Sequence, residues 1–205
     1  MPDATVRLVP RVRRTFGFAT HARQMLTVAR ESFQEIVVSW GGLALAGMAA
    51  LAVVSGTQIE HMGVPLFPTA ERITAFLAAP LTSPQEVFGM IVPLLIVIYA
   101  GELVWRERDA RLSEITGAAP VPEWVYFLGK FAGLGLVLVA LQALMMAAGM
   151  LIQVLLGHVD FEIGLYARIL FGLQLPDYLL FALLALVVHA LVNHKYVGHL
   201  VVVIA

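Results

Sequence analysis

The sequence predicts an all-α, polytopic membrane protein, in which an amphipathic surface helix precedes four transmembrane helices and a truncated fifth. Apolar residues make up 60% of the 205 residues and charged residues 13%, whereas soluble domains carry about 25% charged residues. The apolar segments are about 20 residues long, as in membrane-spanning helices, rather than the roughly ten-residue alternating strands of membrane barrels. No cysteine is present, which excludes disulfides, thiolate metal sites and cysteine catalysis.

The N-terminal region combines a basic tail, residues 1–15, with an amphipathic helix that opens a single transmembrane domain, residues 16–205. Apolar residues of this helix recur at helical spacing, namely Phe18, Ala22, Met25, Leu26, Ala29 and Phe33. Polar residues fall elsewhere on the helical wheel, namely Arg23, Gln24, Arg30 and Glu31. A helix with this pattern is expected to lie on a membrane surface.

Two spans are expected in the first half of the domain. Residues 36–54 are uncharged and long enough to cross once. A long loop, 55–82, has room for a short helix after Thr69. The second span is expected at 87–105, with a kink at Pro93.

The second half predicts two further complete spans. Residues 120–157 form a long third span, and residues 176–192 form the fourth. Between them, residues 158–175 are half apolar and are expected to lie in the membrane interface. The last ten residues, 196–205, would cover about half of the hydrocarbon thickness, so the chain is expected to be cut within a fifth span.

The distribution of basic residues predicts the orientation, because cytoplasmic loops are rich in lysine and arginine. Eleven lie on the N-terminal side of the expected spans: Arg7, Arg11, Arg13, Arg14, Arg23, Arg30, Arg106, Arg108, Arg111, Lys130 and Lys195. Two lie on the other side, Arg72 and Arg168. The N-terminus and the loop after the second span are therefore expected in the cytoplasm.

A charged stretch follows the second span. Its seven charged residues are Glu102, Arg106, Glu107, Arg108, Asp109, Arg111 and Glu114. The pairs Glu102–Arg106 and Glu107–Arg111 have i,i+4 spacing, which predicts a short amphipathic helix near 102–116 that ends before two prolines. Acidic residues contribute little to topology, so the balanced charge favours a docking surface. The alternative is a solvated loop whose charges anchor the topology.

Several uncharged residues within the expected spans are candidates for packing or for a substrate path. Gly129 and Gly133 form a G-x-x-x-G pattern, which allows close approach of another helix. Polar residues inside a membrane can line a path or can bond to neighbouring helices. Both alternatives apply to Gln142, Gln153 and His189.

Motifs for chemistry are missing from the sequence. The chain has no G-x-x-x-x-G-K-[ST] phosphate-binding loop, no H-E-x-x-H and no G-x-S-x-G. His189, His194 and His199 are spaced by five residues, which does not place them on one helix face. We therefore expect no enzymatic activity, no bound cofactor and no metal in this chain.

Three stretches resemble a known family. The segment "WRERDARLSEITGAAPVPEWVYFLGK" (105–130) resembles the first cytoplasmic loop of ABC-2-type exporter permeases. The stretches "YAGELVWRERD" (99–109) and "NHKYVGHLVVV" (193–203) are similar to the permease portion of bacterial permease/zinc-aminopeptidase fusion proteins. The resemblance covers most of residues 16–205.

The resemblance implies a multi-pass permease of the bacterial inner membrane. Its partners would be the lipid bilayer, a second permease unit or another copy of the chain, and a separate ATPase subunit that binds the ATP; no nucleic acid is implied. The helix near 102–116 would couple the permease to that ATPase. The alternative is a membrane anchor for a C-terminal peptidase domain that lies outside this chain.

Overall fold

The computed structural model describes residues 17–58, 69–77, 87–109, 121–192 and 194–204, and every regular element among them is helical. These elements are α1 (Phe18–Val38), α2 (Trp40–Gln58), α3 (Ala70–Leu77), α4 (Val87–Asp109), α6 (Glu123–Leu155), α7 (Ile163–Tyr166), the π-helix η2 (Ala167–Gln174), α8 (Leu175–Leu191) and α9 (Lys195–Ile204). The predicted all-α class is therefore confirmed for the described residues.

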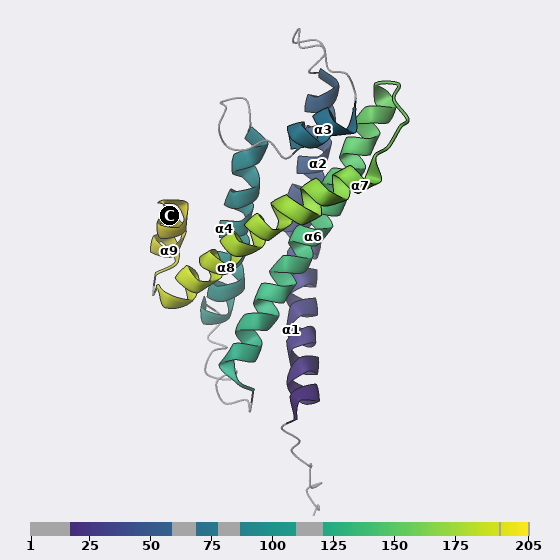
Figure 1. The fold of residues 1–205 in the computed structure, drawn as a ribbon. Coiled ribbons are helices and arrows are strands. Elements are labelled where there is room, and N and C mark those ends of the chain that lie inside the picture. Colours follow the sequence, from purple (N-terminus) through teal and green to yellow (C-terminus); the bar gives the residue numbers. More distant parts are fainter. Residues whose placement is uncertain (1–16, 59–68, 78–86, 110–120, 193, 205) are drawn as a thin grey trace, which may run out of the picture.

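The long helix α6 organises the bundle. Its 33 residues correspond to about 50 Å, well beyond the hydrocarbon thickness of about 30 Å. Figure 1 shows α1 and α2 following one another along α6, and both helices pack on it. The core lies where α2, α4 and α8 meet α6, around fully buried residues such as Ile96, Leu134 and Leu186.

The amphipathic helix predicted near residue 18 is confirmed as α1, and part of its apolar face packs within the protein. Ala29 and Ile36 are buried, and α1 packs chiefly on α6. Phe18 and Leu26 stay exposed. Glycines on α6 leave room for this approach of α1, and the expectation that α1 lies on a membrane surface stays a prediction.

Helices α3 and α4 come close to the sequence expectations. A short helix does follow Thr69, and it packs on α6 and α7. Helix α4 contains Pro93, as expected, but it continues through Asp109. The charged stretch therefore begins as the last two turns of α4 itself rather than as a separate helix. The rest of the helix predicted near 102–116 lies outside the described residues.

The segment 158–175 was expected to lie in the interface; the structure makes its residues from Ile163 onward continuous with the helix that follows, and their place relative to a membrane stays a prediction. Helices α7, η2 and α8 follow one another without a break, and α7–η2–α8 crosses α6 and α4 obliquely in Figure 1. Within an α-helix the ring of Pro176 would clash with the carbonyl of the residue four positions earlier. The π-helical turns before Pro176 change the spacing of the carbonyls there, so the helix continues past it.

Three helical stretches among the described residues are long and apolar enough to cross a membrane. They are Trp40–Thr57, Glu123–Leu155 and Ile163–Leu191. These stretches correspond to the first, third and fourth spans expected from the sequence. The second expected span lies in the 23-residue α4, and the ten-residue α9 is a shorter apolar helix. The count of four spans and part of a fifth thus remains a prediction.

Candidate functional site

The junction between α1 and α2 is a tight turn built around Ser39. The Ser39 hydroxyl donates to the carbonyl of Ile36 at 2.8 Å and accepts from the N–H of Gly41 at 3.2 Å. A Cβ on Gly42 would lie 1.9 Å from the carbonyl oxygen of Val37, so no other residue fits there without moving the backbone. The short side chains and the serine cap thus allow α1 to end and α2 to begin within one residue.

Helix α4 holds this junction from the side. The hydroxyl of Tyr99 donates to the carbonyl of Gly41 at 3.1 Å, in a buried position. A Cβ on Gly41 would lie 2.9 Å from that hydroxyl. Glycine is therefore needed at Gly41 for the close approach of α4, and any shift of α4 at Tyr99 acts directly on the α1–α2 turn.

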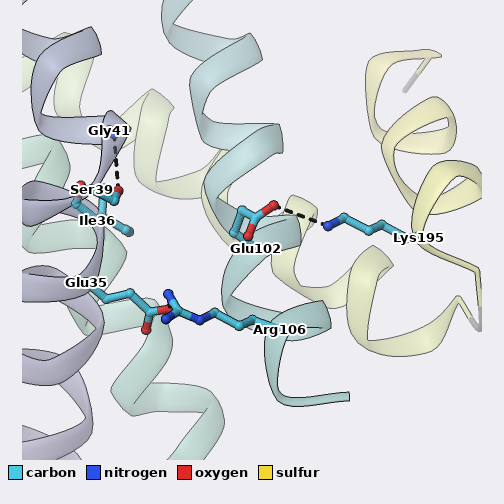
Figure 2. Close-up of polar contacts among 7 residues, drawn as sticks. All are labelled: Glu35, Ile36, Ser39, Gly41, Glu102, Arg106 and Lys195. Atoms are coloured by element: carbon cyan, nitrogen blue, oxygen red, sulfur yellow. Dashed lines mark hydrogen bonds and ion pairs between the residues drawn. The ribbon is translucent and has the colours of Figure 1, made fainter. Parts of the chain in front are cut away.

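After Tyr99 along the chain, two ion pairs join the charged end of α4 to different helices (Figure 2). Arg106 pairs with Glu35 near the end of α1. Glu102 pairs with Lys195 at the start of α9, with 3.2 Å between Oε1 and Nζ. The side chains are partly exposed, from 33% for Lys195 to 65% for Arg106. The end of α4 is thus bracketed by α1 and α9.

The sequence had suggested that Glu102 pairs with Arg106 along one helical turn, but the structure bonds each of them to another helix. A charged side chain at a helix surface can exchange an i,i+4 partner for one on a neighbouring helix at little cost, because either pair contributes only a few tenths of a kcal/mol. The neighbouring helices therefore decide the pairing.

The other five residues of the predicted docking surface are only partly placed. Glu107, Arg108 and Asp109 lie in the last turn of α4, and nothing is described of their side chains. Arg111 and Glu114 lie outside the described residues. The structure therefore brings Glu102 and Arg106 together with α9 and α1 and leaves the docking role of the stretch untested.

Gly129 and Gly133 lie on the face of α6 that meets α1. A Cβ on Gly133 would lie 2.6 Å from Cβ of Ser32 and 2.8 Å from the carbonyl oxygen of Ala29. A Cβ on Gly129 would lie 2.7 Å from Cβ of Val28. The two glycines therefore form a groove in which the backbone of α1 lies, one turn before the Glu35 that reaches α4.

The buried glutamines of α6 are bonded to the helical segment 163–191. Gln142 donates from Nε2 to Oε1 of Gln174 at 3.1 Å, and Gln174 donates to the hydroxyl of Tyr178 at 2.8 Å. The hydroxyl of Tyr166 donates to Oε1 of Gln153 at 2.9 Å. In this structure both α6 glutamines therefore serve helix–helix contacts. Tyr166 and Gln174 went unrecognised in the sequence because their segment was expected to lie in the interface.

His189 belongs to a different group of residues. It is fully buried, and its Nδ1 accepts a hydrogen bond from Nε1 of Trp105 at 3.3 Å. The ring of His199 lies edge-on to it, with 4.6 Å between the centroids. The three candidates for a substrate path thus fall into two separate helix contacts. Over the part of the chain that the structure covers, no three His, Asp or Glu side chains are grouped as metal ligands.

An all-helical bundle with several membrane-length apolar helices is a structure that can span a membrane. Residues 38–205 match the family model described as ABC-2 family transporter protein. The chain belongs to this family, which confirms the resemblance at the level of the family and makes the protein a membrane transport component. Neither the comparison with curated proteins nor that with solved structures gave a match.

Proposed function

We propose that this chain is the permease component of an ATP-driven exporter of the ABC-2 type, with α4 as its second membrane span and a separate ATPase docked at residues 102–116. Family membership supports the permease role. The sequence carries no phosphate-binding loop of its own, so the nucleotide would be bound by the partner. A second permease unit or a second copy of the chain would complete the transport domain.

The observation that carries the coupling proposal is the bracketing of α4. Arg106 contacts α1 through Glu35, and Glu102 contacts α9 through Lys195. One turn further into the bundle, Tyr99 is bonded to the α1–α2 turn. A displacement of residues 107–116 by a docked ATPase would therefore be passed to α1, α2 and α9 together.

Partly exposed ion pairs suit such a joint. Each contributes only about 0–1 kcal/mol, so it can break and re-form as the helices shift. The orientation that fits this role places the N-terminus and the end of α4 in the cytoplasm of a bacterial cell, in agreement with the bias of basic residues.

The test reverses two charges at the end of α4, Glu107→Lys with Asp109→Lys. The matched control is Asp160→Lys with Glu162→Lys, which changes the same two residue types at the same spacing in an exposed loop that precedes α7. The tagged chain is purified from the membranes of its own host, and a photoreactive ATP analogue labels any nucleotide-binding subunit that purifies with it.

We expect the control to retain the labelled subunit and the α4 variant to lose it, because like charges brought together at an interface cost several kcal/mol. Both variants should insert normally. Full retention of the subunit by the α4 variant would show that these charges only anchor topology. No labelled subunit with the unaltered chain would favour the alternative, a membrane anchor for a peptidase domain.

A further inference from the structure

Two histidines close the contact between α4, α8 and α9. His189 of α8 and His199 of α9 stack edge to face, and each ring occupies a space left by a glycine. A Cβ on Gly101 would lie 2.6 Å from Cε1 of His199, and a Cβ on Gly198 would lie 2.6 Å from Nδ1 of His189. The two rings therefore fill part of the contact that α9 makes with α4 and α8.

The hydrogen bond to Trp105 defines the protonation state of His189 in this arrangement. An indole N–H can only donate, so Nδ1 of His189 must carry a lone pair and the ring proton lies on Nε2. Nε2 is buried and faces the backbone of Val97 without reaching hydrogen-bond geometry. A second proton on Nδ1 would set two N–H donors against each other.

Titratable side chains of two other helices lie near His189. Helix α9 brings His199 and Lys195 toward it, and Nδ1 of His199 lies 2.8 Å from the carbonyl oxygen of Lys195. Helix α4 contributes Glu102, which is already paired with Lys195. The charged side chains of α6, Glu123 and Lys130, lie in its first turns, where it packs on α1.

We propose that Trp105, His189 and His199 form a pH-sensitive latch, which holds α9 on α4 while His189 is neutral and releases α9 when His189 is protonated. This inference goes beyond the proposed export function and does not depend on a partner ATPase. Because Trp105 directly precedes Arg106, the state of the latch would act on the same end of α4 that carries the ion pair to Glu35.

Trp105 itself provides the measurement. The other tryptophans, Trp40 and Trp124, are exposed at 86% and 48%, so both can be replaced by phenylalanine. Trp124 must be removed in any case, because its ring lies 5.7 Å from the ring of His21 and would give a pH response of its own. In the remaining single-tryptophan protein, emission and acrylamide quenching are recorded from pH about 8 to about 3, which extends below the range in which an exposed histidine titrates.

We expect acidification to remove most of the Trp105 emission, since a protonated imidazole quenches indole, and to make Trp105 accessible to acrylamide as α9 leaves. His189→Asn should abolish the transition, because the amide oxygen of asparagine accepts the indole hydrogen bond but is not protonated in this range. The matched control is His194→Asn, at the exposed histidine of the α8–α9 connector, which should leave the transition unchanged.

If His189→Asn folds poorly, a second variant, Lys195→Gln, still tests the proposal. Removing this positive charge, which also leaves Glu102 unpaired, favours protonation of His189, so the transition should move to higher pH. A transition that persists in His189→Asn would overturn the proposal. So would quenching of Trp105 without increased access to acrylamide, a transition unaffected by Lys195→Gln, or no transition at all.

Discussion

The charged end of α4 and the glutamine-rich interior of the bundle use polar residues in opposite ways. At the end of α4, ionised side chains pair across helices while remaining partly in water. In the interior, Gln142, Gln153 and Tyr166 are at most 1% exposed and are bonded as neutral groups.

The two arrangements differ in the free energy of folding that is lost when one partner is removed. A buried donor or acceptor without a partner costs about 1–3 kcal/mol, whereas an exposed ion pair contributes about 0–1 kcal/mol. The interior bonds therefore determine which helices pack together, and the pairs at the end of α4 can exchange partners without unfolding the bundle.

The largest effect is expected from a change that separates α1 from α6. Gly133→Leu places atoms against the backbone of Ala29, which cannot yield as a side chain can, so we expect a loss of about 3 kcal/mol or more and displacement of α1. Gly47→Leu is the matched control, because a Cβ on Gly47 meets nothing within 4 Å. The midpoint of thermal unfolding in detergent measures both, and equal losses would argue against the packing role of Gly133.

Removal of Gln174 tests the interior network. Gln174→Leu takes away the partner of Gln142 and a donor to Tyr178, so we expect a loss of about 1–2 kcal/mol in unfolding free energy. Adding Gln142→Leu should recover part of this loss, because both members of the pair are then apolar. If the double variant lost more unfolding free energy than the two single variants together, the result would contradict the proposed pairing.

The ion pair between α1 and α4 should respond more weakly. Glu35→Arg and Arg106→Glu should each cost less than about 1 kcal/mol, and the two together should restore the pair with opposite polarity. A double-mutant cycle on unfolding free energy measures the coupling, which high salt should reduce. A coupling as large as that between Gln142 and Gln174 would remove the distinction between the two regions.

The smallest effect on stability is expected from labelling sites that report on orientation. The chain has no cysteine, so single cysteines at the exposed positions Thr27 of α1 and Glu71 of α3 can be labelled selectively. An impermeant reagent added to intact cells should reach the site at residue 71 and not the one at residue 27. Labelling at residue 27 from outside would reverse the proposed orientation and place the end of α4 away from any cytoplasmic ATPase.

The sequence predicted part of the candidate site, and there is a physical reason why it did not predict the rest. The charged stretch and its position after an apolar helix follow from composition. Its pairing does not, because Glu102–Arg106 and the observed pairs have similar energies, while the actual partners lie 71 and 93 residues away in the chain. No local pattern distinguishes between such alternatives.

Pro176 shows that local sequence patterns were also insufficient to predict part of the fold. Residues 158–175 are half apolar and were expected to lie apart from the span that begins at Pro176, and proline normally starts a helix or breaks one. In the structure a π-helical stretch, η2, leads without a break into α8, which contains Pro176 in its first turn. Hydrogen bonds lie on both sides of Pro176, where Tyr166 is bonded to Gln153 of α6 and Tyr178 to Gln174.

The sequence by itself determined the class of protein, the amphipathic α1, the long α6 and the concentration of charge at the end of α4, because apolar length, helical periodicity and charge are properties of contiguous residues. The tertiary structure decided that Gly129 and Gly133 receive α1, that the interior glutamines bond to the segment 163–191, and that His189 meets Trp105 and His199. These contacts join residues far apart in the chain, and their formation depends on which helices come to lie side by side.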